Sequence, residues 1–197
     1  MTRNRLLNIA IGLCKFIRLV YILIFIILTT VFVHFQLDNN NYEWNYSNTN
    51  KAHNFASFFN INIHKSWKIG AISNTKEDKT VFALSEITKP SLYINYLKVV
   101  SVLIFMFLSV KEFQKIMQSI MSFKTFRNEN VKSFRRIGKY IFIIFLLSSY
   151  MSISFNYGGF SEFNISFTPL ILMLIAFIMA EIFKEGLLLK QENDLTI

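Results

Sequence analysis

Four stretches of the chain are apolar over lengths that are typical of membrane-spanning helices. The clearest is LVYILIFIILTTVFVHF, at residues 19–35, which contains no Asp, Glu, Lys or Arg. A helix needs about 20 mostly apolar residues to cross the ~30 Å hydrocarbon layer of a bilayer. The pattern therefore predicts an all-α membrane protein with four transmembrane helices, at residues 16–36, 92–111, 139–156 and 167–185.

The first apolar stretch has some features of a secretory signal, because it is N-terminal and follows several basic residues. A signal peptide, however, has a shorter apolar region and ends at a cleavage site made of small residues. The sequence TTVFVHFQ, which closes this stretch, offers no such site. We therefore interpret the stretch as a retained helix.

The loop at residues 37–91 mixes irregular and strand-like patterns. It begins with LDNNNYEWNYSNTN, which has turn formers but no periodicity and predicts irregular structure. From Phe59, FNINIHKSWKI alternates apolar and polar residues, and residues 80–84 are rich in strand formers. A second alternating segment, MSISFNYGGFSEFNISF, has Gly158 and Gly159 as a candidate hairpin turn. The two loops are therefore expected to share a small extracytoplasmic β-cap.

The loop at residues 112–138 has a helical pattern that continues the second span. Its apolar positions recur at helical spacing: Phe113, Ile116, Met117, Ile120 and Met121. Polar residues occupy the other face: Lys111, Gln114, Lys115, Gln118 and Ser122. Asn128 and Glu129 suit the start of the next helix. That helix is expected to carry a basic stripe made of Lys132, Arg135, Arg136 and Lys139.

The composition and charge of the chain agree with membrane insertion and indicate an orientation. Of its 197 residues, 53% are hydrophobic, and the formal net charge is +9. In membrane proteins, loops rich in Lys and Arg stay in the cytoplasm. Basic residues gather before the first span and between the second and third, while residues 154–166 contain none. We therefore expect a multi-pass protein of the inner or plasma membrane with both termini cytoplasmic, and the bilayer rather than nucleic acid explains the charge.

The cytoplasmic tail at residues 186–197 is acidic, whereas the middle loop is basic. Glu181, Glu185 and Glu192 fall near one face of a continuing helix, with Leu188 in the same stripe. One hypothesis is that this acidic face docks on the basic loop. The alternative, left open by the sequence, is that both faces are solvated beside anionic lipid headgroups.

No pattern in the chain indicates an enzyme, a metal site or a cofactor. Cys14 is the only cysteine, and the three histidines lack the close spacing of metal ligands. No phosphate-binding glycine loop, nucleophile elbow or zinc-protease motif is present. Lys98 and Glu181 lie within predicted spans, where charged residues often have functions. Snorkelling explains Lys98, and a local pair with Lys184 explains Glu181.

The second half of the chain resembles a family of small bacterial four-helix membrane proteins named DUF2975. The resemblance rests on the C-terminal TPLILMLIAFIMAEIFKEGLLLKQENDLTI and on FKTFRNENVKSFRRIGKYIF in the middle loop. Within the second string, the residues that match are Phe126, Asn130, Val131, Ile137 and Gly138. The resemblance implies four spans, no established activity, and genes that often adjoin one for a small helix-turn-helix regulator.

The leading functional hypothesis is a membrane interaction protein that sequesters a cytoplasmic partner, with a helix-turn-helix regulator as the partner implied by the resemblance. The residues expected to contact that partner are Arg135, Arg136, Glu181, Glu185, Glu192, Asn193 and Asp194. One alternative is a small oligomeric transporter or pore subunit with Lys98 and Glu181 on its path. Another is a toxin-immunity or stress protein, in which the outer cap would carry the specificity.

Overall fold

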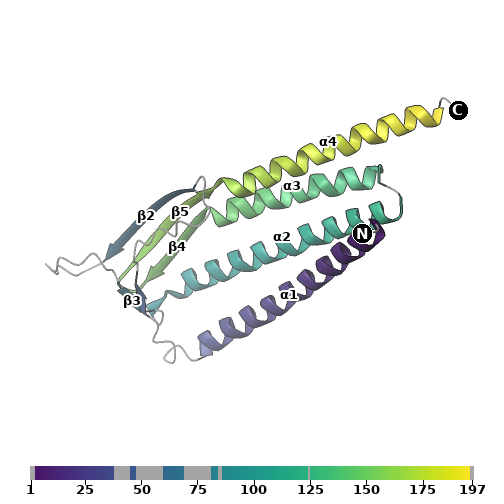
Figure 1. Ribbon diagram of the computed structural model, residues 1–197. Coiled ribbons are helices and arrows are strands. Elements are labelled where there is room, and N and C mark those ends of the chain that lie inside the picture. Colours follow the sequence, from purple (N-terminus) through teal and green to yellow (C-terminus); the bar gives the residue numbers. More distant parts are fainter. Residues whose placement is uncertain are drawn as a thin grey trace. The chain divides into compact units, whose positions relative to one another are not determined.

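The structure is a computed structural model of the chain, and it describes residues 3–37, 45–47, 60–68, 81–83, 86–123 and 125–195. These residues form four helices: α1 (Arg3–Leu37), α2 (Lys89–Met121), α3 (Asn128–Ser148) and α4 (Phe167–Leu195) (Figure 1). Within this described part, α1, α2 and α4 are long and apolar enough to cross a membrane. The chain is therefore a membrane protein, and three of its predicted spans are supported.

α3 is not one of these three helices, because charged residues occupy its first half. The uncharged run that follows, residues 140–148, is about 13 Å long as a helix, well short of a bilayer. The predicted span at 139–156 is wrong in its second half, since the helix ends at Ser148 and Tyr150–Phe155 is a strand. The alternating sequence YMSISF explains this strand. A fourth crossing stays a prediction.

The strands form two small antiparallel sheets. β1 (Asn45–Ser47) pairs with β3 (Val81–Ala83). β2 (Asn60–Lys68), β5 (Gly158–Ser166) and β4 (Tyr150–Phe155) form a second sheet in the order β2-β5-β4 (Figure 1). Because β2 comes from the first predicted outer loop and the other two strands from the second, the prediction that these loops share β-structure is confirmed. The extracytoplasmic position of the sheet stays a prediction.

Two details of the loops differ from the sequence-based expectation. The asparagine-rich stretch is not wholly irregular, because Asn45–Ser47 pairs with β3, while residues 38–44 and 48–50 lie outside the described part. The turn of the β4–β5 hairpin is residues 156–157, since Phe155 pairs with Gly158. Asn is a favoured turn residue, so Asn156 takes the place expected for the glycines, both of which lie in β5.

The chain divides into two compact units. Unit 1 comprises residues 1–25, 102–146 and 167–197, and unit 2 comprises residues 26–101 and 147–166. Unit 1 thus contains all of α4, most of α3 and one part each of α1 and α2. Unit 2 contains the sheets and the remaining parts of those helices.

The core of unit 1 is an apolar cluster contributed by α2, α3 and α4. Its buried members are Ile116, Val131, Phe134, Ala180 and Phe183. Ala180 is fully buried, as is Ile116. Because closely packed side chains make many van der Waals contacts, this cluster holds the three helices against one another.

In unit 2, polar side chains of α2 and of Thr88, which directly precedes it, cap the outer edge of β4. Thr88 and Ser91 bond with the backbone of Ser154, and Asn95 Nδ2 donates to the Ser152 carbonyl at 2.9 Å. Lys98 Nζ donates to the Tyr150 carbonyl. These side chains are three or four residues apart, so they share one face of the helix. They supply hydrogen-bond partners to an edge strand, where unpaired backbone groups otherwise invite association.

Candidate functional site

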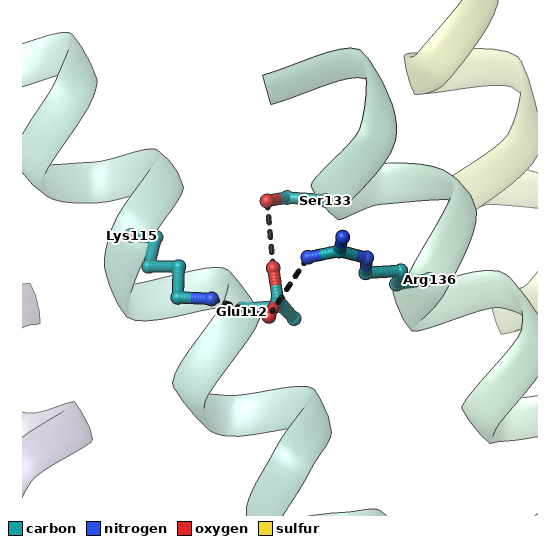
Figure 2. Close-up of polar contacts among 4 residues, drawn as sticks. All are labelled: Glu112, Lys115, Ser133 and Arg136. Atoms are coloured by element: carbon teal, nitrogen blue, oxygen red, sulfur yellow. Dashed lines mark hydrogen bonds and ion pairs between the residues drawn. The ribbon is translucent and has the colours of Figure 1, made fainter. Parts of the chain in front are cut away.

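The most buried charged group in the described part of unit 1 is Glu112, on α2. Its side chain is 8% exposed and lies against α3 (Figure 2). Ser133 Oγ donates to one carboxylate oxygen at 2.7 Å, and Lys115 Nζ binds the other at 2.6 Å. The Arg136 guanidinium lies 3.6 Å from that second oxygen. We call these four residues the Glu112 cluster. It gives the buried carboxylate hydrogen-bond and ion-pair partners, and it joins α2 to α3.

Arg135, the neighbour of Arg136, binds α4 instead. Its Nη2 donates to Glu181 Oε1 at 2.6 Å, and Lys184 Nζ lies 3.3 Å from the other Glu181 oxygen. All three side chains are about half exposed. The consecutive arginines of α3 therefore reach carboxylates on two different helices, so the predicted basic stripe is partly neutralised within the protein.

Two glycines allow close packing beside these ion pairs. A Cβ atom on Gly138 of α3 would lie 3.0 Å from the Phe177 ring of α4. A Cβ atom on Gly186 of α4 would lie 2.3 Å from the Phe126 ring, which belongs to the turn between α2 and α3. Real Cβ atoms do not approach rings so closely, so a larger residue at Gly186 would displace the Phe126 ring.

The turn between α2 and α3 is also held by hydrogen bonds. Asn130 is 3% exposed, and its Nδ2 donates to the Thr125 carbonyl at 2.7 Å and to Ser119 Oγ at 2.9 Å. The Arg127 carbonyl accepts the first helical hydrogen bond of α3, from Val131. Asn128 is therefore one position inside the helix rather than its cap. The expected first-turn acid, Glu129, is confirmed.

On the other side of unit 1, α1 is joined to α2 by Arg18. Its Nη1 donates to Gln114 Oε1 at 3.0 Å, and its guanidinium lies 4.8 Å from the centre of the Phe107 ring. Gln114 is 8% exposed, whereas Phe113 is 42% exposed. The predicted polar face of this part of α2 therefore supplies a buried residue, because Gln114 binds Arg18, whereas Phe113 on the apolar face is exposed.

The seven residues expected to contact a partner fall into two groups. Arg135, Arg136 and Glu181 form ion pairs within the protein. The other four are exposed on the last turns of α4: Glu185, Glu192, Asn193 and Asp194. The expected docking of acidic α4 on basic α3 is therefore seen at Arg135 and Glu181. It is not seen in any described contact of Glu185 or Glu192.

The sequence analysis missed Glu112, and a signal for it was present. Glu112 is the only acidic residue among residues 87–128, and it precedes Lys115 by three positions. A lone acid at the polar end of an apolar helix, spaced to pair on its own helix, is a candidate for a buried ion pair. Its partners on α3 could not be read from spacing, because they depend on how two helices pack.

The two residues considered for transport, Lys98 and Glu181, each have a structural partner. Lys98 caps the β4 edge in unit 2, and Glu181 pairs with Arg135 and Lys184 in unit 1. Among the described residues, no three His, Cys, Asp or Glu side chains are placed together to hold a metal ion. The absence of a cofactor stays an expectation.

Comparison with known proteins gives one match. The family model described as "Protein of unknown function (DUF2975)" matches residues 80–197. No curated protein and no solved structure matches the chain. The matched region contains α2, α3 and α4, and therefore both ion-pair groups and both tight glycine contacts.

Proposed function

The chain belongs to the DUF2975 family, which has no assigned function, and from this premise we propose that it is a non-enzymatic membrane protein that binds a cytoplasmic partner through the end of α4. The length of α4 carries the proposal. The helix continues to Leu195, although Phe183 is its last buried residue. The segment beyond Phe183, about three helical turns, is longer than the core of unit 1 requires.

A four-span topology places this segment in the cytoplasm. α3 packs between α2 and α4, since Glu112 joins it to one and Arg135 joins it to the other. Because both neighbours qualify as spans, we take α3 to cross the membrane with them. The ion pairs lower the cost of its charged half. The basic residues before and within α3 then mark the cytoplasmic side.

The exposed end of α4 carries apolar anchors as well as acids. Leu188 and Leu195 are 43% and 86% exposed, and seven residues separate them. Residues seven apart share one helical face, and such pairs anchor helices in the grooves of partner proteins. Asp194 and Gln191 are exposed on the same segment. This face suits a partner with an apolar groove.

The partner class that we propose is a small helix-turn-helix regulator, because genes for such proteins often adjoin genes of this family. Binding to α4 would hold the regulator at the membrane and away from DNA. Arg135, Arg136 and Glu181 then support the helices, while the partner would bind the exposed end of α4 that carries Glu185, Glu192, Asn193 and Asp194.

An affinity pull-down from solubilised membranes tests the proposal. The full chain is compared with a chain ending at Leu187 and with the double variant Leu188→Ser, Leu195→Ser. Ending at Leu187 retains Gly186 and its contact with Phe126, so the bundle keeps its packing. Gln191→Ala is the matched control on the same exposed segment.

Support requires one cytoplasmic protein that is recovered with the full chain and with Gln191→Ala, and is lost with the other two. The recovered protein, purified separately, should bind the full chain in nanodiscs and bind the Leu188→Ser, Leu195→Ser variant at least about tenfold more weakly, as the loss of two apolar anchors predicts. Equal recovery by all four chains overturns the proposal.

The two alternative functions stay predictions, and no contact in the described part specifically favours either. A transporter that uses Lys98 and Glu181 would lose flux when both become apolar. Because both side chains have structural partners, the folded fraction must be measured in the same samples. An immunity protein would instead depend on the sheet of unit 2.

A further inference from the structure

The outward face of α4 carries a seam of apolar and acidic residues. Ile178, Ile182, Glu185, Leu189 and Glu192 are spaced four, three, four and three residues apart, as in a heptad. The three apolar members are 53–61% exposed. They border a groove of 710 Å³. Lipid explains Ile178 and Ile182, but not Leu189, which is 61% exposed between two acids in the segment proposed to lie in the cytoplasm.

The outward face of α1 carries a matching seam with a positive charge. Arg5, Ile9, Leu13 and Phe16 are exposed, the last three by 55–63%, and lie opposite the buried residues Ile11 and Cys14. Residues 1–37 contain no acidic side chain. Beside this seam, Gly12 has no atom within 4 Å of a Cβ position, which allows another helix to approach closely.

Contacts within unit 1 show which positions of the two seams lie at the same level. Arg18 binds Gln114 of α2, the Glu112 cluster joins α2 to α3, and Arg135 binds Glu181. Arg18 is therefore level with Glu181 to within about one helical turn.

From this level, α1 toward its N-terminus and α4 toward its C-terminus advance in the same direction, by about 1.5 Å per residue. Phe16 is then level with Ile182 and Glu185. Ile9 is level with Leu189 and Glu192, and Arg5 lies near Glu192. The apolar and charged members of the two seams are thus matched in height.

We infer that α4 of one copy binds α1 of a second copy, with Ile9 against Leu189 and Arg5 beside Glu192. Identical chains take the same depth in a membrane, so the matched heights are retained between copies. The contact joins two different faces and is heterologous, so it closes into a ring or continues as a chain. The seam shares Glu185 and Glu192 with the proposed partner contact, whereas Leu188 and Leu195 lie beside it and α1 has no part in that contact.

Disulfide trapping in membranes tests the inference. In a Cys14→Ala background, one tagged copy carries Ile9→Cys and a differently tagged copy carries Leu189→Cys. Mild oxidation should yield a mixed disulfide between the two tags. The matched control replaces Leu189→Cys with Leu174→Cys, which is also exposed on α4 but about 22 Å further along the helix.

The charges are tested by adding Glu185→Lys and Glu192→Lys to the copy that carries Leu189→Cys. Loss of the contact with Arg5 should lower the yield of mixed disulfide about fivefold. Added lysines do not oppose the topology, because this end is already the basic side.

The inference is overturned if Leu174→Cys gives as much mixed disulfide as Leu189→Cys, if Ile9→Cys copies link mainly to each other, or if no link forms while both copies reach wild-type levels. A partner protein or lipid would then cover the seam. Stepwise photobleaching of the unmodified sequence, labelled with a fluorescent tag, is the second measurement. Single bleaching steps in membranes would also exclude the contact.

Discussion

Arg135 and Arg136 are consecutive residues of α3, yet they pair with carboxylates on opposite neighbours of that helix. Arg136 lies 3.6 Å from Glu112 of α2, and Arg135 lies 2.6 Å from Glu181 of α4. Successive residues on a helix are about 100° apart, which lets two adjacent side chains reach different helices. The pair thereby links three helices at one level of unit 1.

Replacing Glu112→Ala should destabilise the protein by about 1–3 kcal/mol, because Ser133, Lys115 and Arg136 lose their shared acceptor. Thermal unfolding in detergent checks this value. The control is Glu129→Ala, which removes a 70% exposed partner of Arg127 and should change stability by less than about 0.5 kcal/mol. Equal effects of the two changes would mean that the Glu112 cluster does not hold α2 to α3.

Replacing Gly186→Val should destabilise the protein by about 1–3 kcal/mol, because the new side chain overlaps the Phe126 ring. The additional change Phe126→Ala should recover part of the loss by making room. At the open position Gly12, Gly12→Ala should instead stabilise the helix by up to about 1 kcal/mol. Thermal unfolding of the unmodified protein and the three variants would show whether overlap with the Phe126 ring causes the loss of stability.

Reversing one charge of the Arg135–Glu181 pair should lower the melting temperature, since Arg135→Glu would place a second carboxylate near Glu181. The exchange Arg135→Glu with Glu181→Arg should restore part of it, although Lys184 would then face an arginine. The same reversal at Glu185, which has no described ion pair, is the control. If the exchange variant melts at no higher temperature than Arg135→Glu alone, Arg135 and Glu181 do not interact directly.

Replacing Asn95→Leu should expose the outer edge of β4 and destabilise unit 2 by about 1–3 kcal/mol, because the Ser152 carbonyl loses its donor. Hydrogen exchange at β4 and β5 amides should accelerate. Leu97→Ala, at a 65% exposed position of the same helix, should leave that exchange unchanged. Unchanged exchange in both variants would show that α2 does not cap the sheet.

Much of the helical architecture could be predicted because apolar periodicity reports it directly. The apolar run of α1 at residues 16–36, the extension of α2 toward Met121 and the continuation of α4 beyond its span were predicted in this way, whereas the start of α1 at Arg3 was not. The end of α3 was misplaced because two signals overlap there. Residues 150–155 are apolar enough to extend a span, yet their apolar and polar side chains alternate as in a strand. They form a strand because they pair with β5.

The candidate site was harder to predict, because an ion pair between two helices depends on how each helix is rotated about its axis and shifted along it. The basic stripe gave the positions of Arg135 and Arg136 but not their separate partners. Phe126, Asn130, Val131, Ile137 and Gly138, which carried the resemblance to the family, contribute to the turn and the core of unit 1. Those residues therefore contribute to the fold of unit 1, and the proposed partner contact uses other residues.

The pairing of β2 with β5 sets an order of events during synthesis. Lys68 pairs with Gly158, so β2 leaves the ribosome 90 residues before its partner strand. At about 5–20 residues per second, this interval is on the order of 5–20 seconds. α2 and α3 are made within that time, so β2 must wait until both helices have been synthesised. Translation speed and chaperones that shield free strands should therefore influence the yield of this protein more than its helical content indicates.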